Sequence, residues 1–281
     1  MKKNETVIIS GCGFKCDSFN QETNVYRDPS VKINIGTATA YSLAEAGYNL
    51  ILLSKTQSKL ETIKCSLLLD FPDIQIQVTS VDLLDPKEVY SFVCNLPKNQ
   101  IYHYVHSAGI SSGAYQLEND NPYLSVEETP INLPTIEFEA VVKSLLIITQ
   151  ALLPIFKKQN QTKFVVVSSM SSVRSVPLGF SHTSAKAGLH NATRSLSLEL
   201  NKLNIFISEV MPGAVDTGMY DNKVVQERVF EMGKMFGYEY DTIPMMPTSA
   251  VADAVKLCIE SKAHILALNM VGAGQWPNLS S

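Results

Sequence analysis

Residues 164–189 read FVVVSSMSSVRSVPLGFSHTSAKAGL, and this stretch indicates both the fold and the position of a site. Its first four residues are apolar and mostly β-branched, which predicts a buried strand ending at two serines. Ser169 is followed thirteen positions later by His182, and four positions after that by Lys186. We expect these three side chains to face one cleft. Each also has a plainer explanation, as one of several serines, a loop histidine and a surface lysine.

Strand-like and helix-like segments alternate along the chain. Buried strands are predicted at 7–9, 50–53, 74–81, 101–106, 164–167, 205–210 and 264–270. Helices are predicted at 37–46, 58–69, 86–96, 136–157, 184–203 and 251–261. This alternation predicts a doubly wound parallel sheet, Rossmann-like, in three α/β/α layers. The irregular stretches 12–34, 110–134 and 214–248 are long enough to be functional loops.

Composition predicts one globular domain over residues 1–281, in the cytoplasm. The net charge is −4 and the Lys and Arg residues are scattered, whereas a nucleic-acid surface needs clustered positive charge. The apolar run 7–9 is too short for a secretory signal, and no unbroken apolar run reaches the ~18 residues of a membrane span. The five cysteines are dispersed, which predicts reduced thiols. The alternative for Cys12 and Cys16, four apart in the glycine turn, is a reactive or metal-binding pair, although they lack nearby His or Cys partners for a metal.

A glycine-rich turn after the first strand is a candidate dinucleotide site. Gly11 and Gly13 follow the strand, and Gly36 opens the next helix. Such glycines let the backbone approach a pyrophosphate, which then lies at the helix N-terminus. This turn is interrupted by a polar insertion at 14–33, which is open to interpretation as a partner contact, a cofactor lid or an unordered excursion. Taken alone, the segment fits a surface loop with turn glycines equally well.

The end of the second strand indicates which dinucleotide would bind. An acidic side chain there would bind the ribose 2′-hydroxyl and favour NAD, and residues 50–59 contain none. Ser54 and Lys55 offer a hydroxyl and a positive charge to a 2′-phosphate. We therefore favour NADP(H) over NAD(H); the alternative is that Lys55 is an ordinary solvated lysine.

Taken together, these motifs resemble the short-chain dehydrogenase/reductase family over nearly the whole chain. Against the family's TGxxxGxG turn the chain has 19 extra residues, and Asn34 replaces the middle glycine of the last GxG. Val81-Asp82-Leu83 matches the segment whose Asp contacts adenine, and residues 106–109 (HSAG) stand where the family has NNAG. Residues 212–217 (PGAVDT) match PGxVxT, which lies along the nicotinamide and pyrophosphate. In the family's Ser, Tyr and Lys layout, His182 stands at the Tyr position.

The resemblance implies hydride transfer between a nicotinamide dinucleotide and a carbonyl or alcohol. Ser169 would hydrogen-bond the substrate oxygen, the residue at 182 would transfer the proton, and Lys186 would bind the nicotinamide ribose and lower the pKa of the acid. The implied cofactor-binding residues are Gly11, Gly13, Asn34, Ile35, Gly36, Ser54, Lys55, Asp82, Leu83, Ser107, Ala108, Gly109, Lys186, Pro212, Gly213, Val215 and Thr217.

Two further features of the family are open in this chain. The family's helix Asn has its place near Val141, which cannot hydrogen-bond, with Lys143 or Ser144 nearby, so this role is unassigned. The family also implies a homodimer or homotetramer formed through the two long helices near 136–157 and 184–203.

Histidine in place of tyrosine changes the acid–base chemistry. A phenol has a pKa of ~10 that a nearby cation lowers toward neutrality, whereas imidazole starts at ~6.5 and is lowered further. We therefore expect His182 to be mostly neutral at pH 7. We predict that it still acts as an acid and base, with reduction favoured at mildly acidic pH. The alternative is a tyrosine from the two long loops that would cover the cleft: Tyr115, Tyr123 or Tyr220.

Two functions remain open. The first is an NADP(H)-dependent ketoreductase whose small carbonyl or alcohol substrate is apolar or acyl-like, because methionines of a substrate lid at 217–247 adapt to apolar ligands. The lid residues in question are Met219, Met232, Met235, Phe236, Met245 and Met246, which would equally suit a helix core. The second is a catalytically silent or non-redox homologue, dehydratase-like or a scaffold, that binds a dinucleotide or an acyl-like ligand. The interrupted glycine turn, His182 and the unassigned helix Asn favour the second, and NADPH binding would discriminate.

Overall fold

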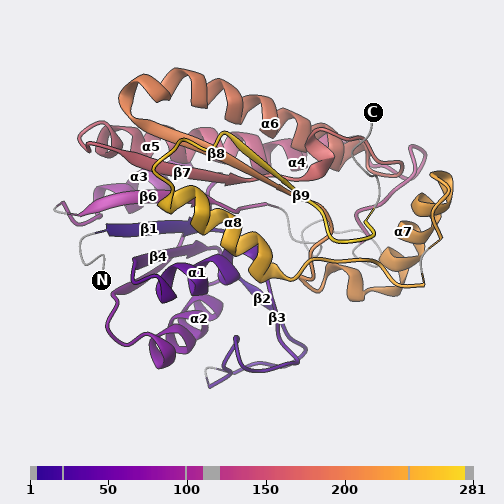
Figure 1. The fold of residues 1–281 in the computed structure, drawn as a ribbon, viewed down its shortest axis with the longest axis horizontal. Coiled ribbons are helices and arrows are strands. Elements are labelled where there is room, and N and C mark those ends of the chain that lie inside the picture. The colour runs from indigo at the N-terminus through magenta and orange to yellow at the C-terminus, as the bar shows by residue number, and fades with distance from the viewer. Residues whose placement is uncertain (1–4, 21, 99, 110–120, 240, 276–281) are drawn as a thin grey trace.

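The computed structural model describes residues 5–20, 22–98, 100–109, 121–239 and 241–275, and it has a seven-stranded parallel sheet at its centre (Figure 1). The sheet has the order β5-β4-β1-β6-β7-β8-β9. Its strands are β1 (Glu5–Ser10), β4 (Asn49–Ser54), β5 (Ile76–Ser80), β6 (Ile101–His106), β7 (Thr162–Val167), β8 (Ile205–Pro212) and β9 (Ala267–Met270). The strand order reverses direction between β1 and β6, so the predicted doubly wound, Rossmann-like sheet is confirmed.

Helices cover both faces of the sheet, which is why its strands are apolar on both sides. The α-helices are α1 (Ile35–Glu45), α2 (Gln57–Asp70), α3 (Pro86–Cys94), α4 (Leu133–Phe138), α5 (Ser144–Phe156), α6 (Phe180–Leu200), α7 (Lys223–Met235) and α8 (Thr248–Glu260). One core cluster joins the sheet to α1, α2 and α8 through Leu43, Leu60 and Val255. The other joins it to α3, α5 and α6, for example through Phe92 and Leu189.

The carboxyl ends of the parallel strands all lie at one edge of the sheet. Open α/β sheets bind ligands in the crevice outside this edge, where the strand order reverses. Ser10 and His106, the last residues of β1 and β6, pair with each other at this point. Ser54 ends the neighbouring strand, and the segment after β7 carries Ser169. The fold therefore directs the predicted site residues toward one crevice.

One long helical stretch, Leu133–Phe156, changes its hydrogen-bonding pattern in the middle. A π-helical turn, Glu139–Lys143, separates α4 from α5. By length and mean hydropathy (1.6) the whole stretch resembles a membrane-spanning helix. Its apolar content has another explanation in the fold, because Leu145, Ile148 and Leu152 are buried in the core cluster that covers the sheet.

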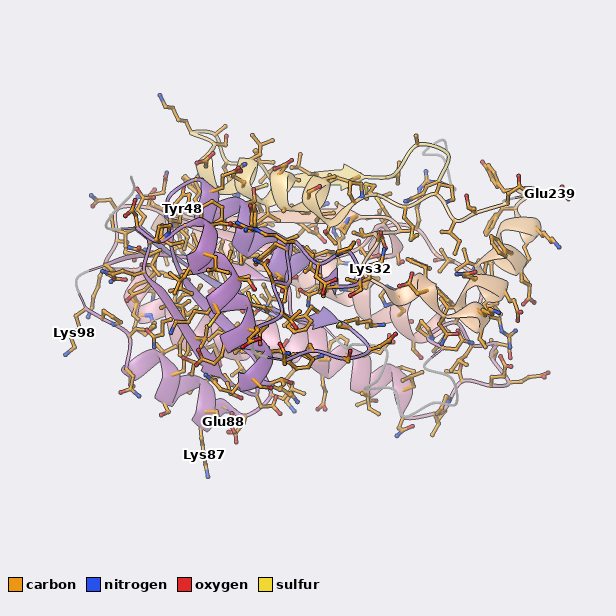
Figure 2. The ribbon with its side chains drawn as sticks, turned by 90° about the horizontal axis from the view of Figure 1, so that it is seen from below. Lys32, Tyr48, Lys87, Glu88, Lys98 and Glu239 are labelled. Carbon is orange, nitrogen blue, oxygen red and sulfur yellow. The ribbon has the colours of Figure 1, made fainter. Side chains whose placement is uncertain are left out.

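The insertion at 14–33 folds onto the domain and not away from it. Its ends pair as two short antiparallel strands, β2 (Phe14–Lys15) and β3 (Lys32–Ile33). The ammonium of Lys32 bonds both carboxylate oxygens of Asp216, at 2.8 and 3.0 Å. In Figure 2 Lys32 lies over the body of the molecule, whereas Lys87 extends from the surface. The insertion therefore contacts the chain that follows β8.

The expectation of an irregular stretch at 214–248 was wrong in its middle, where α7 forms. Val225, Val229 and Met232 are spaced four and three apart and are all buried, as the apolar face of a helix requires. They form a small separate core cluster with Tyr220. The lid region is thus built around an amphipathic helix.

Candidate active site

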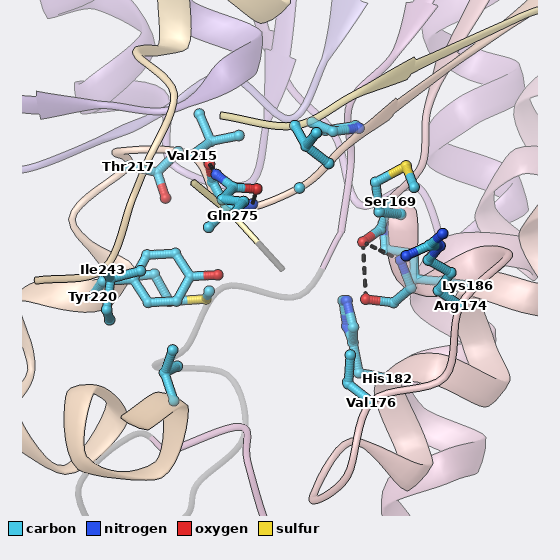
Figure 3. Close-up of a pocket in the computed structure, with 18 of the residues that line it drawn as sticks. Ser169, Arg174, Val176, His182, Lys186, Val215, Thr217, Tyr220, Ile243 and Gln275 are labelled. Carbon is cyan, nitrogen blue, oxygen red and sulfur yellow. Dashed lines mark hydrogen bonds between the residues drawn. The ribbon is translucent and has the colours of Figure 1, made fainter. Parts of the chain in front are cut away.

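A cavity of about 260 Å³ brings together Ser169, His182 and Lys186 (Figure 3). The same cavity is lined by further predicted cofactor-binding residues, namely Ile35, Pro212, Gly213, Val215 and Thr217. These residues come from the start of α1, the turn after β7, α6, the last residue of β8 and the segment that follows it. Motif residues as far apart in the chain as Ile35 and Thr217 therefore share one cavity at the carboxyl edge of the sheet, whereas Gly11, Gly13 and Gly36 are not among its lining residues.

Ser169 is held by the turn that follows β7. Its side chain caps a short 3₁₀ helix, Met170–Ser172, by accepting from the N–H of Ser171 at 3.1 Å. Its hydroxyl donates to the Oγ of Ser171, also at 3.1 Å. The hydroxyl is thereby fixed at the cavity wall, where a ligand oxygen can reach it.

His182 and Lys186 lie on one face of α6, since residues four apart are neighbours on a helix. The helix begins at Phe180, not at the predicted Ser184, so the reading of His182 as a loop residue is wrong. Both side chains are partly buried in the cavity wall. In Figure 3 the imidazole of His182 points into the cavity from the side of Ser169 and Lys186, opposite Tyr220.

The charges of these two side chains are strongly altered by their surroundings. Burial, reinforced by the positive charge of Lys186, lowers the pKa of His182 to about 3. Burial also lowers the pKa of Lys186 to about 8, an effect that the carboxylates of Glu137 and Glu209 partly offset. At pH 7 the site therefore contains a neutral imidazole beside a mostly protonated ammonium. The direction expected for His182 agrees, but burial, the larger cause, could not be inferred from the sequence.

A buried polar network lies at the end of β6, behind the cavity. The hydroxyl of Tyr104 donates to Ser10 Oγ at 2.8 Å and lies 2.9 Å from His106 Nδ1. Ser144 Oγ lies 3.5 Å from the other ring nitrogen of His106. Burial, together with the charge of Lys186, lowers the pKa of His106 to about 3. His106 is therefore a second neutral imidazole near Lys186, which the HSAG pattern alone did not indicate.

The π-helical turn sets the orientation of the three residues near the place of the family's helix Asn. Lys143 points away and pairs with Glu139 at 2.8 Å, while Val141 is buried among apolar residues. Ser144 is buried; its hydroxyl donates to the carbonyl oxygen of Ala140 at 2.6 Å and lies 3.5 Å from His106 Nε2. A π turn inside an α-helix frequently marks a functional site, and here it places Ser144 beside the strand ends.

The glycine turn is compact despite the insertion. Gly11 has a φ of +80°, and a Cβ there would lie 2.5 Å from the carbonyl oxygen of Ser107. A Cβ at Gly36 would lie 2.7 Å from the carbonyl oxygen of Gly11. Asn34 joins the two ends, because its amide donates to Gly11 O at 2.8 Å and accepts from Gly13 N at 3.2 Å. The insertion therefore begins and ends beside Gly11 and Gly13, and the glycine turn stays compact.

The residues predicted for the adenosine end lie at the ends of neighbouring strands. Lys55 follows β4, is mostly exposed, and pairs with Asp82 at 2.7 Å. Ser54 is the last residue of β4. The side chain of Leu83 is buried in the core cluster that also contains Val89 and Phe92 of α3. Gly109 is the last described residue before position 121, and Ser107 and Ala108 are partly buried beside it.

The outer wall of the cavity is largely apolar. Val229, Met232 and Ile243 line it from the lid region, together with Met219. Met246 is buried, but Met235 and Phe236 are exposed, and Met245 packs only at the edge of the lid's core. Of the expected lid residues, Met219 and Met232 thus line the cavity.

Two tyrosines also reach the cavity. The hydroxyls of Tyr123 and Tyr220 lie 3.3 Å apart, and both residues line the wall opposite His182. Burial raises the pKa of Tyr220 well above the ordinary phenol value, an effect that Tyr123 reinforces. Tyr115, the third tyrosine considered, lies outside the described residues.

Comparisons with known proteins agree with this geometry. The model of the short chain dehydrogenase family matches residues 33–228. Levodione reductase from Leifsonia aquatica is 26% identical over 198 residues, which cover 68% of this chain and 69% of that protein. An NADP-dependent 3-hydroxy acid dehydrogenase from Schizosaccharomyces pombe is 27% identical over 186 residues, 65% of this chain and 68% of that protein.

Solved structures share the fold over almost the full length. An alcohol dehydrogenase from Thermococcus sibiricus, complexed with 5-hydroxy-NADP, superposes with a TM-score of 0.73 at 18% identity, covering 98% of this chain and 99% of its own. An NADPH-bound short chain oxidoreductase from Pseudomonas aeruginosa with an atypical catalytic center gives 0.74 at 17% identity, covering 97% of both chains. With the family model matching most of its length, this chain belongs to the short-chain dehydrogenase family of oxidoreductases.

Proposed function

We propose that this protein is an NADP(H)-dependent oxidoreductase that interconverts a carbonyl and an alcohol, with Ser169, His182 and Lys186 as its catalytic residues. The observation that carries the proposal is that these three side chains and the segment from Pro212 to Thr217 line the same cavity. The nicotinamide cofactor, when bound, would supply or accept the hydride. The chain's own residues would position the substrate oxygen and supply or accept its proton.

The residues around the cavity fit such a cofactor. Ile35, at the N-terminus of α1, lines the cavity together with Val215 and Thr217. The end of the glycine turn and the segment proposed to bind the nicotinamide therefore border the same cavity. Farther along the strand ends, the hydroxyl of Ser54 and the exposed ammonium of Lys55 suit a 2′-phosphate. This preference for NADP(H) is supported by the absence of an acidic residue at the end of β4.

The altered charges suggest how the chain would move the proton. A neutral imidazole has one N–H to donate to the substrate oxygen, but it is a weak net acid. Lys186, one helical turn away, holds a proton at pH 7 because its pKa is about 8. In reduction, His182 would give its N–H proton to the developing alkoxide while its other nitrogen is reprotonated from Lys186. Ser169 would hold the same oxygen with its hydroxyl, and oxidation would reverse each transfer.

This scheme changes the expected pH dependence. Because the pKa of His182 is about 3, its protonation does not change between pH 5 and 8 and would not change the reaction rate in that range. The group that titrates near this range is Lys186, which loses its proton as the pH rises through about 8. The expectation that His182 favours reduction at mildly acidic pH is therefore replaced: the rate should be constant below about pH 7 and fall above it, as Lys186 loses its proton.

The substrate is best described as a small carbonyl or alcohol compound with an apolar or acyl-like body. The cavity wall from the lid is apolar, with Met219, Val229, Met232 and Ile243. Named relatives support this class, since they include a levodione reductase and a very-long-chain 3-oxoacyl-CoA reductase from Vanderwaltozyma polyspora. A cytoplasmic location and a homodimer or homotetramer remain predictions.

Two alternatives have less support. Tyr123 and Tyr220 reach the cavity, but burial raises both phenol pKa values, so they would be poorer proton donors than Lys186. A silent or non-redox homologue is the other alternative, favoured by the way Asn34 and Thr37 already bond the N–H of Gly13. That N–H is one of the donors that the turn would otherwise offer to a pyrophosphate.

Binding and turnover separate these possibilities. Calorimetry with NADPH and NADH, followed by a panel of apolar ketones and 3-oxoacyl thioesters with NADPH oxidation as readout, tests the proposal. We expect NADPH binding and turnover of at least one carbonyl. Absence of NADPH and NADH binding would contradict the proposed oxidoreductase function. Cofactor binding without turnover of any carbonyl would favour the catalytically silent homologue.

A further inference from the structure

The face of α6 that carries His182 and Lys186 continues to His190, one helical turn farther along the chain. Residues four apart are neighbours on a helix, so Lys186 lies between the two histidines. His182 and Lys186 line the cavity, whereas His190 is not among its lining residues. The side chain of His190 is 15% exposed. His190 therefore lies one turn behind Lys186, outside the cavity, with partial access to solvent.

The ring of His190 is held by a buried carboxylate. Its Nδ1 atom lies 2.7 Å from Oε2 of Glu209, and Glu209 is only 2% exposed. Glu209 lies in β8, two residues after Ile207, which shares a core cluster with Leu189 of α6. The other carboxylate oxygen of Glu209 is buried and has no hydrogen-bond partner in the part of the chain that the structure describes. Acidic side chains are rarely buried in this way unless they are paired, so this carboxylate requires an explanation.

Four elements contribute the titratable groups around Lys186. These groups are His182 and His190 of α6, His106 of β6, Glu137 of α4 and Glu209 of β8. Burial lowers the pKa of His182 and of His106 to about 3, so neither ring holds a second proton at pH 7. Of these groups, His190 is the imidazole that combines a carboxylate partner with exposure to solvent, a combination that suits proton transfer.

We propose that His190, held by Glu209, returns a proton to Lys186 after each reduction. This inference rests on the proposed oxidoreductase function, in which Lys186 passes its proton to His182. The imidazolium of His190 gives its Nε2 proton, through one water molecule, to the neutral amine of Lys186. Its Nδ1–H stays bonded to the carboxylate of Glu209, and Nε2 then takes a proton from solvent. In oxidation each transfer is reversed.

His190 and Glu209 act through Lys186 and are therefore positioning residues, which gives them a kinetic signature. The first reduction uses the proton already present on Lys186, whereas each later one requires that the proton be returned. Removing the pair should slow steady-state turnover by roughly tenfold to a hundredfold, at and below the lower end of the range for a positioned proton donor. The rate of the first turnover should not change.

The test compares the unsubstituted protein with His190→Gln and Glu209→Gln. Stopped-flow absorbance of NADPH, with the carbonyl that the panel of ketones and 3-oxoacyl thioesters identifies, gives the first and later turnovers. Glutamine at position 190 can still donate to Glu209 but cannot carry the proton, and glutamine at position 209 keeps the shape of glutamate without its charge. Asn191→Ala, at the exposed neighbouring position of α6, is the control and should leave both phases unchanged. Thermal melting verifies that each variant is folded.

Two further measurements are independent of these variants' turnover. In His190→Ala the shortened side chain leaves room for imidazole from the buffer, which should restore part of the steady-state rate, whereas sodium chloride of equal ionic strength should not. In the free protein, NMR titration of isotope-labelled lysine should show a lower pKa for Lys186 in Glu209→Gln. The expected direction follows because the negative charge of Glu209 raises the pKa of Lys186.

The outcomes distinguish this inference from the function on which it rests. Unchanged steady-state rates in His190→Gln and Glu209→Gln would overturn the relay and leave the oxidoreductase function standing. An equal loss in the first and later turnovers would also overturn it, because the pair would then act on the chemical step or on the fold. If the unsubstituted protein neither bound NADPH nor reduced any carbonyl, the function itself would fail, and the inference with it. A loss confined to later turnovers and reversed by imidazole would support the relay.

Discussion

The two halves of the proposed cofactor site differ from the family pattern in opposite ways. At the glycine turn the chain gains 19 residues, yet Gly11, Asn34 and Gly36 meet in a compact turn. At the catalytic end the spacing of Ser169, His182 and Lys186 is unchanged, yet one side chain is replaced. The glycine turn thus keeps a compact geometry although residues are inserted into it. The catalytic end keeps its residue spacing although one side chain differs in its chemistry.

The difference follows from what each change costs. An insertion whose ends lie side by side closes a loop at a cost that grows only slowly with length. The short β2–β3 pairing and the contact of Lys32 with Asp216 hold the insertion on the domain. Replacing a phenol by an imidazole instead changes which group is protonated at pH 7, because burial lowers the pKa of His182 to about 3. We therefore expect the catalytic half to be the more sensitive to substitution.

Lys186→Met should have the largest effect, because the lysine supplies both the proton and the charge of the site. We expect carbonyl reduction to fall by roughly 10³-fold, within the usual range for a positioned acid. Initial rates of NADPH oxidation measure this. Lys202→Met, an exposed lysine just after the same helix, is the control and should leave the rate unchanged. A loss of less than about tenfold would exclude Lys186 as the proton source.

His182→Ala should reduce the rate by about 10²-fold, since water can partly replace a neutral donor. His182→Tyr restores the family's residue and should retain more activity than His182→Ala. The same assay of NADPH oxidation applies, with thermal melting to verify folding. If His182→Ala had the unsubstituted rate, the proton would have to pass by another route, and Tyr123→Phe and Tyr220→Phe would then be the variants to measure.

Lys55→Ala tests the adenosine end, where the effect should be limited to cofactor choice. Loss of a charge-assisted contact to a 2′-phosphate should weaken NADPH binding by about tenfold and leave NADH binding unchanged. Dissociation constants for both cofactors give the result. Lys87→Ala removes another exposed lysine, shown extending from the surface in Figure 2, as the matched control. Equal weakening of both cofactors would mean that Lys55 does not select between them.

Asn34→Ala tests the glycine turn itself and should have the smallest catalytic effect. The Asn34 side chain caps α1 by accepting from Thr37 N and ties Gly11 to Gly13. Loss of a cap costs about 1–2 kcal/mol of unfolding free energy, and we expect kcat to change little. Chemical denaturation and steady-state rates measure the two quantities. A large loss of kcat with unchanged stability would contradict a purely structural role.

Much of the fold was predictable because its signals are local. The buried strands and the spacing from Ser169 to Lys186 follow from residue patterns, and the strand predicted at 101–106 has the bounds of β6. The middle of the lid was not recognised as α7, although Val225, Val229 and Met232 have helical spacing. The start of α6 was predicted four residues late, at Ser184, whereas the helix begins at Phe180.

The features missed at the site depend on contacts between distant residues. No local pattern shows that Ser144 Oγ lies 3.5 Å from His106 Nε2, because a π-helical turn sets its orientation. Nor does a local pattern show that Gln275 reaches Ala214, 61 positions away. The size of the pKa change at His182 likewise depends on burial, which only the packed structure provides. The sequence therefore indicates which residue types to expect at the site, but not their orientation or their protonation state.

The pH dependence of carbonyl reduction tests most directly whether a neutral His182 works with a protonated Lys186. Reduction consumes a proton, and Lys186 holds one below its pKa of about 8. The rate of NADPH oxidation by the unsubstituted protein should therefore be constant from pH 5 to 7 and fall as the pH rises through about 8, with a slope of about tenfold per pH unit. A fall through about 6.5, the ordinary value for imidazole, or a rate independent of pH from 5 to 9, would contradict the account.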